Sequence, residues 1–123
     1  GNAVRRRVLN EEKIINFLKQ YDYDIIDCFD LDVEEQLKIF SEAKNIIIPS
    51  GASMANLMFT PDDINVVEIR SNLDGDFSKK INLNKRFTLY SFDKTIKTGE
   101  ELRKDISVDI DELKKLIEDN NIY

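Results

Sequence analysis

The feature that most constrains the fold is a repeated alternation between short apolar runs and longer amphipathic segments. Residues 45–49 and 65–69 are rich in isoleucine and valine, and polar or turn-forming residues bound each run. Short β-branched runs of this kind are typical of strands buried on both faces of a parallel sheet. We expect two further strands at 24–29 and 87–92, and a last edge strand near Ile106 and Val108.

The amphipathic segments carry the start signals of helices. Asp32 and Asp109 each stand three residues before a glutamate, Glu35 and Glu112, which is the spacing of a capping box. Helices are therefore expected to begin at these two aspartates, and further helices are expected at 10–21, 52–59 and 77–83. Helices that alternate with buried strands favour an α/β fold: a Rossmann-like three-layer open sheet, mostly parallel, with helices on both faces.

Composition narrows the possible functions. The 123 residues suffice for one domain, which we assign to 4–123, and Gly1-Asn2-Ala3 is interpreted as an expression scar. The formal net charge of −6 disfavours a nucleic-acid partner. The chain has no histidine, and Cys28 is its single cysteine, so histidine-based catalysis and thiolate metal clusters are excluded within it. We expect neither a metal nor a cofactor.

No apolar run of the sequence approaches the roughly 20 residues that span a bilayer. No signal peptide and no Asn-x-Ser/Thr glycosylation site is visible. We therefore expect a cytoplasmic chain without a transmembrane segment.

An open α/β sheet binds its ligands at the carboxyl ends of its strands. This rule singles out the strand-to-helix turn at Ser50, Gly51 and Ala52. Glycine permits close backbone approach, the helix start offers free N–H groups to a phosphate or diphosphate, and the Ser50 hydroxyl adds a donor. The alternative is that Ser50-Gly51 is an ordinary turn.

Several charged residues elsewhere in the chain have both a functional and a purely structural interpretation. Glu68, near the end of the 65–69 strand, either accepts hydrogen bonds from ribose or sugar hydroxyls or pairs with Arg70. The arginines at 5–7 either clamp a phosphate or form a solvated basic cluster. Asn10 and Glu11 are explained by helix capping alone, and Asp62-Asp63 by turn chemistry.

Three familiar α/β sites are absent from the sequence. None of the four glycines falls into G-x-G-x-x-G or into a P-loop. A receiver domain would need a phosphorylated aspartate where the 45–49 strand ends, and Pro49-Ser50 stands there instead.

Four segments in the same order resemble glycosyltransferase family 61. Residues 7–12 are similar to its R-x-x-N-E motif and residues 34–43 to its eQ-x-x-l-f-x-x-A helix. Residues 47–59 are similar to i-v-g-p-H-G-A-x-l-x-N-x-x-F and residues 66–69 to the v-i-E-l strand. The resemblance covers residues 5 to about 70, and many bacterial members of the family are capsular polysaccharide biosynthesis proteins.

The resemblance implies an inverting glycosyltransferase with two facing Rossmann-like domains, of the GT-B type. This chain would be the C-terminal domain, which binds the nucleotide sugar; a missing N-terminal domain would hold the glycan acceptor and supply the base, and the first strand would also be missing. The full-length protein would act at the inner face of the membrane. The implied donor-site residues are Arg7, Asn10, Glu11, Ser50, Gly51, Ala52, Asn56 and Glu68. No catalytic residue and no metal ligand is assigned within the chain.

One position departs from the family pattern. The family usually has histidine before the Gly-Ala pair, and this chain has Ser50 there. Serine donates a hydrogen bond but cannot carry a protonated charge. The alternative function is therefore a catalytically degenerate α/β domain with an interaction or scaffolding role.

Overall fold

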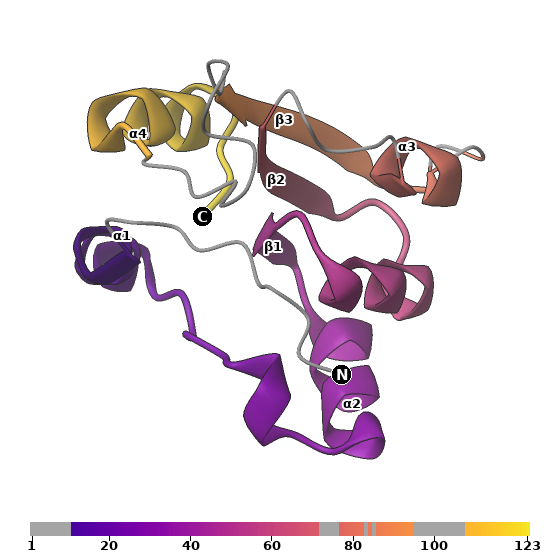
Figure 1. Ribbon diagram of the computed structural model, residues 1–123. Coiled ribbons are helices and arrows are strands. Elements are labelled where there is room, and N and C mark those ends of the chain that lie inside the picture. The colour runs from indigo at the N-terminus through magenta and orange to yellow at the C-terminus, as the bar shows by residue number, and fades with distance from the viewer. Residues whose placement is uncertain (1–10, 72–76, 83, 85, 95–107) are drawn as a thin grey trace, which may run out of the picture.

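The computed structural model contains a three-stranded parallel sheet, described here together with the rest of residues 11–71, 77–82, 84, 86–94 and 108–123. The strands are β1 (Asn45–Pro49), β2 (Asn65–Ser71) and β3 (Thr88–Lys94), and β2 lies in the centre (Figure 1). Both pairings are parallel, with Ile48 opposite Glu68 and Glu68 opposite Ser91. The expected parallel arrangement of these three strands is confirmed.

Helices cover both faces of the sheet, as expected for an α/β fold. On one face lie α1 (Glu11–Leu18) and α4 (Ile110–Asp119). On the other lie α2 (Val33–Glu42), the 3-10 helix η3 (Ala52–Phe59) and the short α3 (Phe77–Ile81), as Figure 1 shows.

The alternation of side chains along β2 creates two cores. Val67 and Ile69 pack with α1 and α4, while Val66 packs on the opposite face. The first core contains Ile14, Phe17, Leu18, Val67, Ile69, Val108, Leu113, Ile117 and Ile122. The second contains Phe40, Ile48, Met54, Leu57, Ile64, Val66 and Phe87. Apolar side chains of β2 therefore reach both cores, and the face of Val66 also carries the buried charged residues Glu68 and Arg70.

Both expected aspartate caps are formed. Asp32 Oδ1 accepts the backbone N–H of Glu35 at 2.8 Å. Asp109 Oδ1 accepts those of Asp111 and Glu112 at 2.9 and 3.2 Å. Each bond satisfies a helix N–H that has no partner within the helix.

The strand expected at 24–29 does not form, and this prediction was wrong. Residues 22–27 have no regular structure, and Cys28–Asp30 form a 3-10 turn, η2. Ile25 and Ile26 are 42% and 44% exposed. A strand needs a neighbour to satisfy its backbone, and β1, at the end of the sheet, pairs only with β2 among the described residues.

The edge strand expected near Ile106 and Val108 lies mostly outside the described residues, Ile106 included. Val108 is buried and lies in no strand; it leads directly into the Asp109 cap. Val33, the first residue of α2, is 70% exposed.

The segment that follows α1 is hydrogen-bonded to the C-terminal residues 118–122. The Tyr23 hydroxyl donates to the carbonyl of Ile122 at 2.6 Å, and the Tyr21 hydroxyl donates to Glu118 Oε1 at 2.8 Å. Ile122 itself is fully buried in the first core. These contacts hold α1 and α4 together on one face of the sheet.

Candidate functional site

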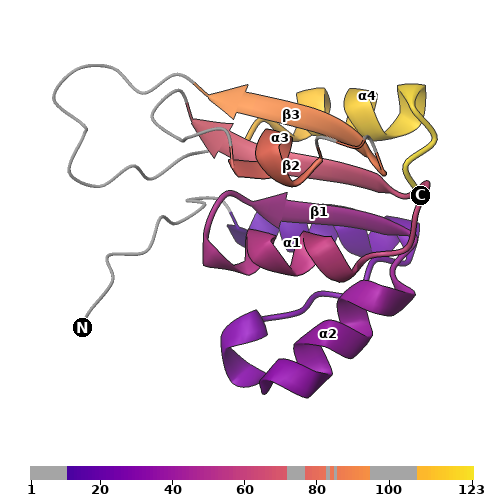
Figure 2. The same ribbon diagram turned by 90° about the vertical axis from the view of Figure 1, so that its right-hand side faces the viewer.

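The Ser50–Gly51 turn lies at the carboxyl edge of the sheet, where the sequence places the site. Ser50 follows the last residue of β1, and its backbone N–H donates to the carbonyl of Ile69 in β2 at 2.9 Å. In Figure 2 the arrow of β1 ends on the side of the sheet where η3 begins. The turn is therefore anchored to the central strand.

The helix after this turn is a 3-10 helix, not the α-helix that its spacing allows. Gly51 is its N-cap, and the N–H of Met54 donates to the Gly51 carbonyl at 3.1 Å. The N–H groups ahead of Met54 have no acceptor within a 3-10 helix. They are the groups that a phosphate would use at this position.

Space for a ligand exists beside Gly51. No heavy atom of the described residues outside its chain neighbours lies within 4 Å of the position that a Cβ on Gly51 would occupy. The residue is exposed and its backbone is extended, with φ of 164°. A larger side chain therefore fits this position without backbone strain, and it would occupy the space beside the turn.

Asn56, assigned to the donor site from the resemblance, makes a structural contact in this conformation. Its Nδ2 donates to Gln36 Oε1 at 2.9 Å. Gln36 Nε2 in turn donates to the carbonyls of Cys28 and Leu31 at 2.7 and 3.1 Å. The chain of hydrogen bonds joins η3 to α2 and to the irregular segment before it.

Glu68 lies inside the molecule. It has no exposed surface, and its Oε1 is 3.8 Å from Arg70 Nη1. By the alternation of β2 it belongs to the face covered by η3 and α3. Of the two interpretations of Glu68, the structure contains the ion pair with Arg70, and a contact with ribose or sugar hydroxyls stays a prediction.

From the sequence, Arg70 is expected only as a possible ion-pair partner of Glu68. It is 9% exposed, and continuing the β1–β2 register by one residue places it opposite Ser50. The backbone of Ser50 therefore lies beside the end of β2, because its N–H donates to the carbonyl of Ile69. The sequence signal for this ion pair is the spacing of two residues between Glu68 and Arg70, because residues two apart in a strand lie on the same face.

Some of the remaining residues that the resemblance assigns to the donor site lie within the described part of the chain, and others lie outside it. Arg7 and Asn10 lie outside the described residues. Glu11 is the first residue of α1, a helix that lies on the face of the sheet opposite η3. Ala52 is the first residue of η3. The structure thus brings together Ser50, Gly51 and Ala52 where β1 ends. Glu68 and Arg70 lie in the neighbouring strand β2, and Asn56 contacts Gln36 of α2.

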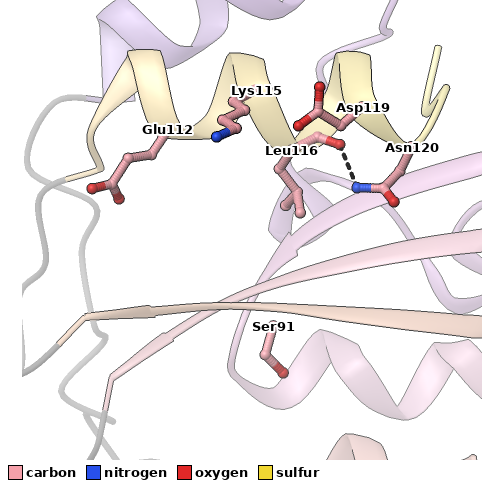
Figure 3. A pocket seen from close by; sticks show the side chains of 6 residues that line it. All are labelled: Ser91, Glu112, Lys115, Leu116, Asp119 and Asn120. Atoms are coloured by element: carbon pink, nitrogen blue, oxygen red, sulfur yellow. Dashed lines mark hydrogen bonds between the residues drawn. The ribbon is translucent and has the colours of Figure 1, made fainter.

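A pocket of about 290 Å³ lies elsewhere, between β3 and α4. Its lining residues are Ser91, Glu112, Lys115, Leu116, Asp119 and Asn120. Figure 3 shows the Ser91 side chain pointing away from α4, and Asn120 Nδ2 donates to the Leu116 carbonyl at 2.8 Å. The lining residues from α4 carry charges of both signs, so this pocket has no clear preference for an anion.

The acidic pair Asp62-Asp63 belongs to a turn, as expected. Asp62 Oδ1 accepts from Arg86 Nε at 2.9 Å, and Asp63 has a φ of 65°. No group of three or more His, Cys, Asp or Glu side chains within the described residues could hold a metal ion. No described helix is long and apolar enough to cross a membrane.

Comparison with known proteins adds one finding. The family described as Glycosyltransferase 61 matches residues 1–67, which include β1, the Ser50–Gly51 turn and η3. Searches of curated proteins and of solved structures gave no significant match. Because the family match covers more than half of the 123 residues, the chain belongs to the glycosyltransferase 61 family.

Proposed function

We propose that this domain binds the diphosphate of a nucleotide-sugar donor at the Ser50–Gly51 turn. The observation that carries the proposal is the position of the turn: it ends β1 at the carboxyl edge of a parallel sheet and lies inside the segment that matches the family. Phosphates bind at such turns because helix N–H groups and a glycine backbone can reach them closely.

The enzyme to which the domain belongs is, in this proposal, an inverting glycosyltransferase of capsular or surface polysaccharide biosynthesis. The chain is its C-terminal, GT-B type donor domain, and a separate domain holds the glycan acceptor. A base on that other domain deprotonates the acceptor hydroxyl, which attacks the anomeric carbon and displaces the nucleoside diphosphate. Family membership supports this proposal.

The role of this chain is to stabilise the leaving diphosphate. The N–H groups at the start of η3 point their partial positive charge at the developing negative charge. Arg7, in the R-x-x-N-E segment, would supply a full positive charge to the same group. No metal is assigned to the donor site. Transfer of the sugar to the acceptor requires both domains, because the reaction depends on holding the two substrates together.

Titration calorimetry with UDP, GDP and CMP tests the donor site. The wild-type chain is expected to bind UDP or GDP, the two that carry a diphosphate, and Gly51→Val is expected to lose binding because its side chain fills the open space beside the turn. Ala55→Val is the matched control, since Ala55 is an exposed residue of η3 beyond its first turn. Circular dichroism should show both variants folded.

A non-catalytic interaction domain is the second candidate function. The observation that favours it is Ser50 at the position where the family pattern has histidine, in a chain that has no histidine. A folded wild-type chain that binds none of the three nucleotides at millimolar concentration would support this function and contradict donor binding.

A further inference from the structure

The irregular segment between α1 and α2 exposes two adjacent isoleucines. Ile25 and Ile26 are 42% and 44% exposed, and neither belongs to the buried residues of the two cores. In Figure 1 the segment runs from α1 towards α2 outside the sheet. Adjacent large apolar side chains that stay on the surface within a charged surround are typical of a contact site for another molecule.

The backbone of these two isoleucines is also unpaired. The hydrogen bonds of the preceding turn end at the N–H of Tyr23, and those of η2 begin at the carbonyl of Asp27. Within the described part of the chain, no hydrogen bond reaches the N–H or the carbonyl of Ile25 or Ile26. Isoleucine has a high β-propensity, so this stretch has the side chains of a strand and free backbone groups, but no neighbouring strand.

The surroundings of the two isoleucines are strongly acidic. Residues 22–35 contain seven aspartate or glutamate side chains, all exposed, and no lysine or arginine. The rest of the chain holds the other 17 acidic and all 18 basic residues, so this segment accounts for the whole net charge of −6. The charge of Asp32 raises the pKa of Glu35 above its ordinary value, as expected where like charges stand close together.

Apolar surface and acidic charge together define the chemistry of the molecule that fits here. The acidic segment would repel the phosphates of a nucleic acid and the anionic surface of a membrane. It attracts a polypeptide with basic side chains, whose apolar side chains would cover Ile25 and Ile26. An extended polypeptide also brings backbone groups for the unpaired N–H and carbonyl groups.

The order of the residues defines the partner further. In a strand, Asp24 would share one face with Ile26, and Ile25 would share the other with Asp27. A matching strand therefore carries two apolar residues between two basic ones, so that each apolar side chain lies opposite an isoleucine. A second copy of the same segment, paired antiparallel in this register, would place aspartate opposite aspartate, which is unfavourable.

We propose that residues 24–27 bind an extended segment of a partner protein with the pattern basic-apolar-apolar-basic, which pairs with them as a strand. The partner's apolar side chains cover Ile25 and Ile26, and a basic side chain lies opposite Asp24. This inference does not depend on the proposed donor site, which lies at the turn after β1.

Four blocked peptides test the proposal by titration into the wild-type chain. Thr-Lys-Val-Val-Lys-Thr is expected to bind, and more weakly at about 300 mM than at about 50 mM salt. Thr-Lys-Ser-Ser-Lys-Thr keeps the charge without the apolar side chains and should bind about tenfold or more weakly. Thr-Glu-Val-Val-Glu-Thr should not bind, and neither should the first peptide with N-methyl groups on alternate residues, which lacks the backbone donors.

Variants of the chain place the contact. Replacing both isoleucines, Ile25→Ser with Ile26→Ser, should weaken the Lys-Val-Val-Lys peptide about tenfold or more. Met58→Ser, at a residue of η3 that is 59% exposed, is the matched control and should change the affinity less than about twofold. Asp24→Lys should weaken the lysine peptide and strengthen the glutamate peptide, whereas Asp119→Lys, at an exposed residue of α4, should do neither.

The backbone amides report whether a strand forms. The amide protons of Ile25 and Ile26 should shift and exchange more slowly with solvent when the Lys-Val-Val-Lys peptide is added. No binding at millimolar peptide, equal binding of the serine peptide, or equal affinity of the double isoleucine variant would each overturn the proposal. A wild-type chain that sediments as a dimer, and as a monomer after the two isoleucine changes, would also overturn it, because the segment would then contact a second copy.

Discussion

Ser50 and Ile69 are joined by a 2.9 Å hydrogen bond from the backbone N–H of Ser50 to the carbonyl of Ile69. This bond extends the β1–β2 pairing by one residue beyond Pro49. It fixes where the chain leaves the sheet and therefore where η3 begins. The orientation of the proposed donor site thus depends on the parallel pairing of two strands that the sequence identifies by their isoleucine and valine content.

The Asp109 cap should contribute measurably to stability. Asp109→Ala removes the acceptor of the N–H groups of Asp111 and Glu112 and should lower the free energy of unfolding by about 1 kcal/mol. Asp109→Asn keeps an acceptor oxygen and should retain most of that stability. Urea denaturation measures both; equal midpoints for Asp109→Ala and the wild type would refute the cap's contribution.

The contact between Asn56 and Gln36 should behave as a structural pair. Asn56→Ala and Gln36→Ala should each destabilise the domain by about 1 kcal/mol, with the double variant costing less than the sum of the two. A double-mutant cycle from urea midpoints measures this coupling. Additive effects would show that the hydrogen bond does not contribute, and would free Asn56 for the ligand role that the family resemblance implies.

Tyr23 should make stability fall at high pH. Burial raises the pKa of Tyr23 to about 12, above the ordinary value of 10.0. The folded state therefore holds this proton more tightly than the unfolded state, so the stabilisation is complete below pH 10 and is lost as pH rises towards 12. Tyr23→Phe should reduce the slope of unfolding free energy against pH in this window. An identical slope in both proteins would contradict the assignment.

Much of the fold could be predicted because its signals are local. The β-branched runs of β1 and β2 and the aspartates at 32 and 109 each specify their element within a few residues. The strand expected at 24–29 failed because strand formation depends on a neighbour, which a run such as Ile25-Ile26 cannot reveal. The intrinsic β-propensity of the isoleucines favours a strand there, but a strand forms only where a neighbouring strand accepts its backbone hydrogen bonds.

The sequence predicts where the candidate site lies but not which contacts its residues make. The rule about carboxyl edges gives the Ser50–Gly51 turn directly. It does not show that Ser50 is bound to the backbone of Ile69, because this contact depends on the β1–β2 register, which sequence spacing across about 20 residues does not reveal. The burial of Glu68 and the contact of Asn56 with Gln36 likewise depend on how η3 and α2 pack over the sheet.

Backbone chemical-shift mapping during a titration with UDP or GDP tests the central claim most directly. Donor binding at the turn predicts that the largest amide shifts occur at Gly51, Ala52 and Ser53, at the start of η3, with smaller shifts at the end of β2. Binding in the α4 pocket would instead shift Ser91, Lys115 and Asn120. Shifts confined to that pocket, or no shifts at millimolar nucleotide, would contradict the account.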